Sequence, residues 1–328
     1  MKRAAYGMFC FLLLFASVGN AQVHPTVAIS GGDDVPIVKR RCQQTLESIL
    51  LEMNRLAKGA GDIALIRKYF TPDAYAIFEK FVVQNHAYTA RKHNEPLMIA
   101  REKGQYYDIR SITVKVALGE TEASDNQSLV FTFSKDGMIV SVRSVLPNYD
   151  YQSVLSNGVS VQDSLVRCRI LDFLERFRMA YNAKDSVFLE KIYSDEALIL
   201  VGTVLHEKKN GDDFSRYSLL SETKFKLVQQ TKREYLDALK KAFKKNSFIN
   251  VRFDSVEVLQ HEKINNLYGI TCWQEWNSAT YSDRGHLFLM MDFRQPEEPV
   301  IHVRAWQPRA FDDGSFVSLY DFDVVQYK

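Results

Sequence analysis

Apolar side chains recur every three or four positions in two stretches of the chain, which is the pattern of a helix that packs one face against a core. The downstream stripe consists of Ile170, Phe173, Leu174, Phe177, Ala180 and Tyr181. An upstream stripe with the same spacing consists of Leu46, Ile49, Leu50, Met53, Leu56 and Ala57. A shorter helical segment follows each stripe and starts at an aspartate, Asp62 or Asp185, a residue type that caps helix N-termini. The pattern predicts an internal repeat whose units each open with two helices.

Segments with β-forming residues follow the helices in both halves, which predicts a sheet in each unit. Ile109-Arg110 and Val142-Arg143 upstream match Val251-Arg252 and Val303-Arg304 downstream. Between the matched segments the downstream half has additional residues, 267–280, which have the pattern of one strand. We therefore predict that the first unit is a degenerate copy that lacks one strand of the second.

The two faces of the expected strand 286–292 differ in polarity between the halves. Leu287, Leu289 and Met291 share one face, which we expect to pack on the helices. The opposite face carries His286, Phe288, Met290 and Asp292, whereas the matching upstream positions are Ser128, Val130, Thr132 and Ser134. We expect this face to be solvated in the first unit and covered in the second, where Phe288 and Met290 would form an interface with the first unit or a dimer partner.

Turn-forming residues between 147 and 160 place the boundary between the units. Thr231 and Glu234 have capping-box spacing and begin a further helix in the second unit. After the turn at Asp312-Asp313-Gly314, β-forming residues predict an extra strand over 315–325 that covers a free sheet edge of the first unit. The predicted organisation is a signal peptide at 1–21, a flexible segment at 22–36, a first domain at 37–148, a linker at 149–164, a second domain at 165–308 and a C-terminal strand extension at 309–328.

The N-terminal segment 1–21 has the features of a secretory signal peptide. Lys2 and Arg3 precede an apolar run that is too short to span a bilayer, and small residues precede Gln22, before which we expect cleavage. The expected location is therefore periplasmic or secreted, with no membrane span. Without Lys2 and Arg3 the basic and acidic side chains are equal in number at 40, which gives no support for a nucleic-acid partner.

Metal and redox chemistry have no support in the residue spacing. Cys42, Cys168 and Cys272 remain after cleavage, and their odd number and wide spacing allow at most one disulfide and match neither a zinc site nor a redox pair. No two histidines have the spacing of metal ligands on one strand or helix. We therefore expect no metal and no cofactor.

The order of elements resembles the nuclear transport factor 2-like superfamily, which includes ketosteroid isomerases and SnoaL-like cyclases. The resemblance rests on the segment from Tyr181-Asn182-Ala183-Lys184-Asp185 to Ala197 and on the stretch from Tyr281 to Pro308, in the form carried by exported proteins of Bacteroidetes-type bacteria. It covers nearly all of 165–308 and, less closely, 37–148. It implies an α+β fold with two tandem cone-shaped domains, each a curved antiparallel sheet with helices packed on one face.

The resemblance also implies where the general base of an isomerase would lie, about four residues after Ala197. That position is Val201 in this chain and its upstream counterpart is Phe78, so neither can transfer a proton. Asp195 and Glu196 belong to the preceding turn, where we expect them to face water.

Aromatic and polar residues on the expected strands are candidates for a ligand pocket: Trp273, Trp276, His286, Arg304 and Trp306. An indole offers a large apolar surface with one hydrogen-bond donor, so a small apolar or aromatic ligand would suit these residues. The competing interpretation is that the tryptophans complete the core or an interface. If the protein is an enzyme, His286, Asp292 and His302 are the candidates for an acid or base.

Three functions remain open at this point. The favoured one is a non-catalytic ligand-binding or protein-interaction module of the cell envelope, whose partner would be a second copy or an envelope protein. The alternatives are a small-molecule enzyme of SnoaL, ketosteroid-isomerase or dehydratase type and a scaffolding subunit of an envelope complex. The enzyme requires two ionisable side chains that converge in one pocket, whereas ligand binding requires only the aromatic walls.

Overall fold

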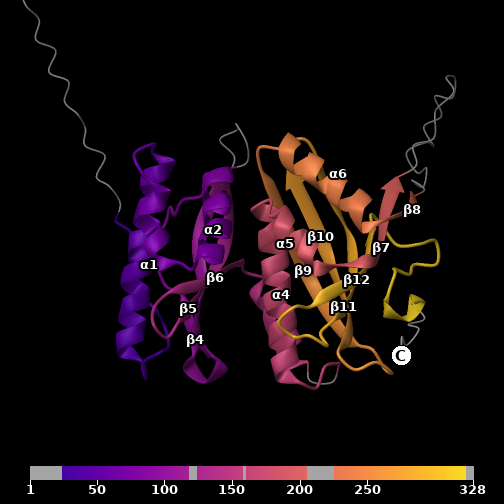
Figure 1. The fold of residues 1–328 in the computed structure, drawn as a ribbon, viewed down its shortest axis with the longest axis horizontal. Coiled ribbons are helices and arrows are strands. Elements are labelled where there is room, and N and C mark those ends of the chain that lie inside the picture. Colours follow the sequence, from indigo (N-terminus) through magenta and orange to yellow (C-terminus); the bar gives the residue numbers. More distant parts are fainter. Residues whose placement is uncertain (1–23, 118–123, 158–159, 205–224, 323–328) are drawn as a thin grey trace, which may run out of the picture.

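The computed structural model describes residues 24–117, 124–157, 160–204 and 225–322, which form two units side by side (Figure 1). The expected signal peptide and its cleavage site lie outside these residues. Each unit has a sheet and a buried apolar core of its own. The chain is therefore a mixed α+β protein, in agreement with the predicted class.

The first unit packs the helices α1 (Pro36–Ala57) and α2 (Pro72–Gln84) against a four-stranded antiparallel sheet. Its strands, in the order in which they pair, are β3 (Leu97–Arg101), β4 (Tyr106–Ala117), β5 (Ser124–Ser134) and β6 (Ile139–Ser144). Two 3-10 helices, η1 (Ile63–Tyr69) and η2 (Glu102–Gly104), and the short parallel pair β1 (Thr26–Val27) and β2 (His93–Asn94) complete it. Leu46, Ile49, Leu50 and Met53 of the predicted stripe are fully buried.

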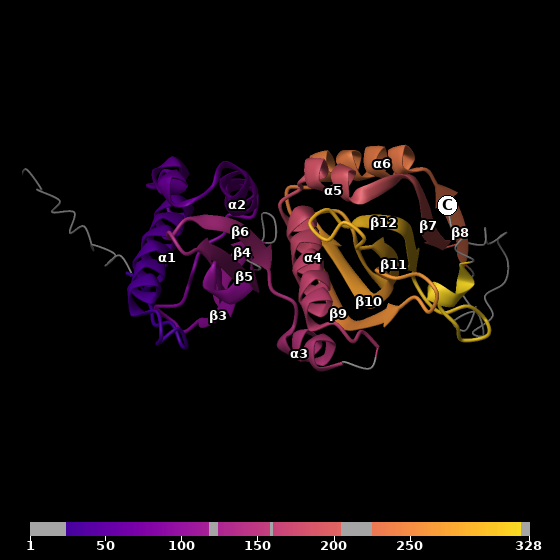
Figure 2. The same cartoon turned by 60° about the horizontal axis from the view of Figure 1, so that its bottom comes forward.

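The second unit has a six-stranded sheet in the order β8-β7-β12-β11-β10-β9, in which β7 and β12 pair in parallel and the other neighbours antiparallel. Its strands are β7 (Tyr193–Val204), β8 (Phe225–Gln230), β9 (Ile249–Gln260), β10 (Leu267–Ser278), β11 (Ser282–Asp292) and β12 (Val300–Gln307). The helices α4 (Ser164–Asn182), α5 (Ser186–Ile192) and α6 (Lys232–Lys245) cover one face, which we call the helix-facing side (Figure 2). We call the opposite face of this sheet the outer side.

The aspartates at the two predicted helix starts have different hydrogen-bond and ion-pair partners. Asp62 caps η1 by accepting a hydrogen bond from the Ala64 amide at 2.9 Å. Asp185 makes no capping bond and instead pairs with Lys80 of α2 at 3.5 Å. Thr231 and Glu234 form the predicted capping box of α6. The predicted N-cap positions are therefore confirmed at Asp62, Asp185 and Thr231, but the Asp185 side chain bonds across to the first unit in place of capping α5.

The first sheet differs from the second by two strands, and not by the one strand predicted. Strands β4 and β5 pair directly with each other. Neighbouring strands of an antiparallel sheet alternate in direction, so removal of one internal strand would require every later strand to run the opposite way. The predicted deletion of a single strand is wrong for this reason. Phe70 forms only an isolated parallel bridge to Ile139, at a position comparable to the pairing of Tyr193 with Ile301 at the start of β7. Phe78, expected on a strand, lies instead on α2.

The segment predicted as a linker, 149–164, is largely helical. Helix α3 (Asn148–Ser156) packs against α4 and β9, and its Tyr151 and Val154 belong to the core of the second unit. Asp150 accepts a hydrogen bond from the Val256 amide at 3.2 Å. The linker prediction is therefore wrong, because two buried apolar side chains suffice to fix a short helix in a segment that is otherwise rich in turn formers.

Helix α4 lies between the two sheets and contributes to both cores (Figures 1 and 2). Ile170 and Leu174 belong to the core of the second unit, whereas Met179 and Ala183 belong to that of the first. Val130 and Thr132, which we expected to be solvated, are 0% and 8% exposed. That prediction is wrong because the polar face of the first sheet is covered by the second unit.

Ion pairs join this polar face to α4. Arg110 Nη2 lies 2.5 Å from Glu175 Oε1, and Arg101 Nη2 lies 2.5 Å from Asp172 Oδ2. Arg143 also contacts Glu175, at 3.4 Å. Glu175 and Arg110 are 0% and 6% exposed, so their charges are removed from water and are compensated within the protein, Arg110 by Glu175 and Glu175 by both Arg110 and Arg143.

The C-terminal segment covers the outer side of the second sheet (Figure 1). Val317, Leu319 and Phe322 pack there with Phe288 and Met290. The rings of Phe288 and Phe322 stack at 5.6 Å. The prediction that Phe288 and Met290 form an interface with another unit or copy is therefore wrong, because a later segment of the same chain covers them.

The predicted strand over 315–325 is also wrong for its described part. Among residues 315–322 the regular element is a 3-10 turn, η4 (Leu319–Asp321). The remainder of the predicted strand lies outside the described residues.

Candidate functional site

The sheet divides the five predicted pocket residues between its two faces. Trp276, Arg304 and Trp306 lie on the helix-facing side: Trp306 belongs to the core there and Trp276 packs on Tyr181, with ring centroids 5.9 Å apart. Trp273 and His286 lie on the outer side, where both contact Phe316 of the C-terminal segment. These five residues therefore do not line one pocket.

Three tyrosines from different elements surround Arg304 on the helix-facing side. Tyr181 of α4 and Tyr235 of α6 join their hydroxyls at 2.7 Å, and the Tyr193 ring lies 5.6 Å from that of Tyr235. The Arg304 guanidinium lies 4.9 Å from the centre of the Tyr235 ring and donates to Gln274 Oε1 at 3.3 Å. We call these five residues the tyrosine–arginine cluster.

Burial determines the charges within this cluster. It raises the pKa of Tyr181 and Tyr193, so both are neutral at physiological pH. Burial alone would lower the pKa of Arg304, but Tyr235, Tyr181 and Tyr193 outweigh it and the net pKa is raised. The cluster is therefore a buried cation, 5% exposed, surrounded by neutral hydrogen-bonding groups.

Asp283 lies on β11 at the end of this site, paired in register with Trp276. Burial raises the pKa of its carboxyl group, while Tyr281 and Arg304 act in the opposite direction. A carboxyl group with a raised pKa can exchange a proton with a bound molecule more readily near neutral pH than an ordinary aspartate.

Four buried polar atoms around the cluster have no hydrogen-bond partner among the described residues: Arg304 Nε, Trp306 Nε1, Tyr193 Oη and Asp283 Oδ1. Each such atom costs about 1–3 kcal/mol when its hydrogen bond is not made. Gly285 permits the close approach of the indole, because a Cβ at that position would lie 2.6 Å from the Trp306 ring. The arrangement therefore presents unused donors and one unused acceptor beside aromatic walls.

The candidate acids and bases do not converge. His302 Nε2 lies 3.3 Å from Asp292 Oδ2, but His286 is stacked on Phe316 with ring centroids 4.2 Å apart. Burial would raise the pKa of Asp292, yet hydrogen bonds from Arg294 lower it overall, so this carboxylate stays ionised. The His302–Asp292 pair is thus tied to Arg294 and does not share a site with His286.

The other residues that the sequence brought into question lie in the core, on the surface or among free thiols. Val201 packs against the core of the second unit. Asp195 is exposed, as expected, and pairs with Lys232 at 2.8 Å. Within the described ranges, Cys42, Cys168 and Cys272 are free thiols and no group of three or more His, Cys, Asp or Glu could hold a metal. No helix in the described part of the chain is long and apolar enough to cross a membrane.

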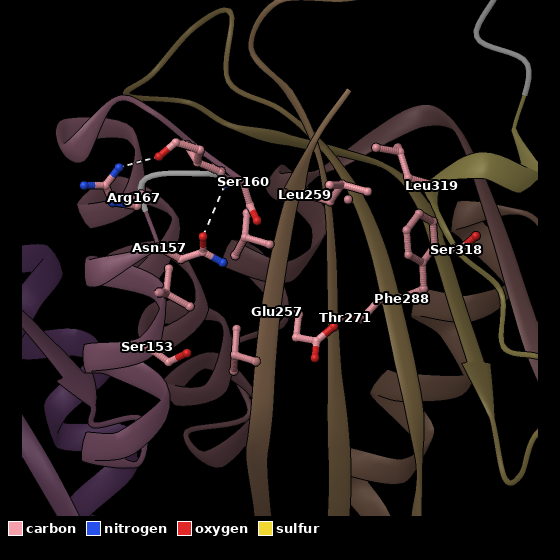
Figure 3. Close-up of a pocket in the computed structure, with 15 residues that line it drawn as sticks. Ser153, Asn157, Ser160, Arg167, Glu257, Leu259, Thr271, Phe288, Ser318 and Leu319 are labelled. Atoms are coloured by element: carbon pink, nitrogen blue, oxygen red, sulfur yellow. Dashed lines mark hydrogen bonds between the residues drawn. The ribbon is translucent and has the colours of Figure 1, made fainter. Parts of the chain in front are cut away.

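A separate hollow of about 370 Å³ opens on the outer side, between α3 and the C-terminal segment (Figure 3). Phe288 and Leu319 line one end and Asn157 and Arg167 the other. Asn157 Oδ1 accepts from the Ser160 amide, and Arg167 donates to the carbonyls of residues 155, 161 and 162. These polar groups are therefore already bonded to the backbone at residues 155 and 160–162 and are not available to a ligand.

We call the tyrosine–arginine cluster, together with Trp276, Trp306 and Asp283, the helix-facing site. Sequence reasoning missed five of its members: Tyr181, Tyr193, Tyr235, Gln274 and Asp283. Strand parity could have found two of them, since Gln274 shares a face with Trp276, and Asp283 with Leu287. The tyrosines come from three elements and nothing in their spacing joins them.

No protein-family model and no curated protein matches this sequence. Among solved structures, the chain is similar to the β subunit of a putative aromatic-ring-hydroxylating dioxygenase from Novosphingobium aromaticivorans (10% identity, TM-score 0.32, covering 44% of this chain and 90% of that one). It is also similar to a putative dehydratase of the nuclear transport factor 2-like family from Streptomyces avermitilis (12%, 0.28, 41% and 89%). A third is a nuclear transport factor 2-like protein of unknown function from Shewanella oneidensis (13%, 0.29, 43% and 97%). The likeness concerns the fold alone.

Proposed function

We propose that the second unit binds a small aromatic or amphipathic molecule that carries an acceptor oxygen, such as a carboxylate or a carbonyl group. The observation that carries this proposal is the set of unpartnered donors at Arg304, Trp306 and Tyr193. A ligand oxygen that accepts from the Arg304 guanidinium would compensate a buried charge, and aromatic walls would contact the ligand's apolar body.

The ligand-binding unit is further proposed to belong to an exported protein that arose by tandem duplication of a nuclear transport factor 2-like domain. Both units place helices on a mainly antiparallel sheet, and the N-cap position Asp62 and the Phe70–Ile139 bridge of the first unit have downstream counterparts in Asp185 and the Tyr193–Ile301 pair. In this proposal the first unit is the degenerate copy and the signal peptide ends before Gln22. Fractionation of the native host and the N-terminal mass of the mature protein test the last point, since a chain that begins at residue 1 in the cytoplasm contradicts it.

Native mass spectrometry of the protein purified from its exporting host tests the binding site. We expect an additional mass that dissociates on denaturation and is lost in Trp276→Ala and Arg304→Gln. Trp273→Ala is the matched control, because this tryptophan lies on the same strand but on the outer side, and it should retain the ligand. A ligand retained by both site variants, or lost equally in the control, argues against the site.

Proton transfer on the bound ligand is the second candidate function. The observation that favours it is the raised pKa of Asp283 beside the tyrosine–arginine cluster. Once a ligand is identified, its chemical conversion and the loss of that conversion in Asp283→Asn, with binding retained, would establish an enzyme. A scaffolding role would require Phe288 and Met290 to contact another protein, but the C-terminal segment occupies that face.

A further inference from the structure

A groove of about 690 Å³ runs between the two units, apart from the helix-facing site. Its walls are the η2 turn of the first unit, the helices α4 and α5, and the loop 295–299 that connects β11 to β12. The volume lies in the range of small-molecule sites, which is about 300–1,000 Å³.

Apolar side chains form much of the surface of this groove. Phe173, Phe188 and Ile192 line it together with Pro296. Leu165 also lines it and is 66% exposed, a large exposure for an apolar side chain of this size. A ligand with an apolar body would remove this surface from water.

The charged residues of the groove are mostly paired with each other. Asp172 is held by Arg101 at 2.5 Å, Lys191 by Glu298 at 2.8 Å, and Arg169 lies 3.8 Å from Glu297. These three pairs have no net charge, and Glu102 and Lys103, which also line the groove, carry opposite charges.

Arg176 differs from these residues. It lines the groove and is exposed; Asp172 and Glu297 act on it electrostatically, but no direct ion pair or hydrogen bond joins it to the described part of the chain. Its guanidinium carbon lies 5.0 Å from the centre of the Phe188 ring, which fixes a cation beside the apolar surface.

We propose that the groove between the units binds an amphipathic carboxylate, with its apolar chain on Phe173 and Phe188 and its carboxylate on Arg176. The planar guanidinium can donate two parallel hydrogen bonds to a carboxylate, which an uncharged head group cannot match. This site uses residues of both units and does not include Arg304, which contacts Tyr235 and Gln274 in the tyrosine–arginine cluster of the second unit.

Equilibrium dialysis of the full chain against labelled decanoate, with labelled 1-decanol as the uncharged probe of equal chain length, tests this proposal. We expect Arg176→Gln to weaken decanoate binding about tenfold while leaving decanol binding unchanged. Phe188→Leu should weaken the binding of both probes. Arg233→Gln is the matched control, since Arg233 is a highly exposed arginine on α6 outside the groove, and it should change neither.

Two further variants separate this site from the helix-facing one. Arg304→Gln should leave decanoate binding intact; if it abolishes binding while Arg176→Gln does not, decanoate occupies the helix-facing site and the groove proposal is overturned. Absence of decanoate binding to the unmodified protein, or equal binding by Arg176→Gln, overturns it as well. Circular dichroism of each variant confirms that it is folded before the comparison is made.

Discussion

Single buried charges hold the two units together. The Glu175 carboxylate accepts hydrogen bonds from Arg110, Arg143 and the Leu146 amide. We expect Glu175→Gln to reduce the free energy of unfolding by about 3–5 kcal/mol, because it leaves the buried Arg110 without its counter-charge and removes one of the carboxylates that face Arg143. Urea denaturation measures this. Glu190→Gln, which removes an exposed pair with Lys240, is the control and should change stability by less than about 1 kcal/mol; equal effects of the two variants would contradict the assignment.

The buried carboxyl group of Asp108 should make the stability of the protein depend on pH. Burial would raise the pKa of its carboxyl group, but Arg143 and Arg101 outweigh burial and lower it overall. A lowered folded-state pKa contributes stability above the unfolded value of about 4, and this contribution is lost as the pH falls through the folded value. Asp108→Asn should therefore lower the melting temperature at pH 7 and make it less sensitive to acid. Melts between about pH 2.5 and 7 test this, and parallel curves for variant and parent would exclude it.

The carboxyl group of Asp283 should change the stability with pH in the opposite direction. Its pKa is raised by burial, so the folded chain holds this proton more tightly than the unfolded chain. Stability due to this group falls as the pH rises from about 4 towards the raised value. Asp283→Asn should accordingly increase the melting temperature at pH 7 and leave it unchanged below about pH 3. A lower melting temperature at pH 7 would show that the ionised carboxylate has a favourable partner.

At the scale of elements, helices with a long apolar stripe were predictable from the sequence, whereas covered faces were not. The β-forming residues around Val317 and Leu319 predicted a strand at a sheet edge of the first unit, whereas both side chains pack on the outer side of the second sheet. Val317 donates its amide to the Gln307 side chain at 2.7 Å, so a side chain takes the place of a strand partner. Trp273 and Trp276 were grouped in one pocket although residues three apart in a strand face opposite sides.

The C-terminal segment should therefore stabilise the second unit as a packed cover. Phe322→Ala removes a ring that stacks on Phe288, and we expect it to reduce the free energy of unfolding by about 2 kcal/mol. It should also increase binding of a hydrophobic dye, because Phe288 and Met290 become accessible. Tyr320, which is 72% exposed, provides the control variant Tyr320→Ala. Equal stability of the two variants would mean that the cover contributes little.

At the scale of the whole molecule, the sequence indicated two units but not their mutual dependence. The repeat pattern predicts α4 as the first helix of the second unit alone, because a stripe at helical spacing identifies only one buried face. In the structure α4 is buried on several sides, and its Met179 and the following residue Ala183 belong to the core of the first unit. The polar residues that cover its second face could be recognised as an interface only once Arg110 and Glu175 were seen together.

A shared helix predicts that the chain unfolds in one transition. The three tryptophans all lie in the second unit, so their fluorescence reports that unit alone, whereas far-ultraviolet circular dichroism reports both. Unfolding of the second unit would remove Met179 of α4 from the first core, expose the apolar side chains packed on it, and break the ion pairs of Arg110 and Arg143 with Glu175. The two probes should therefore give coincident urea midpoints, as required of a two-state transition. Separate midpoints would show that the first unit remains folded without α4, and the buried ion pairs would then serve only to orient two independent domains.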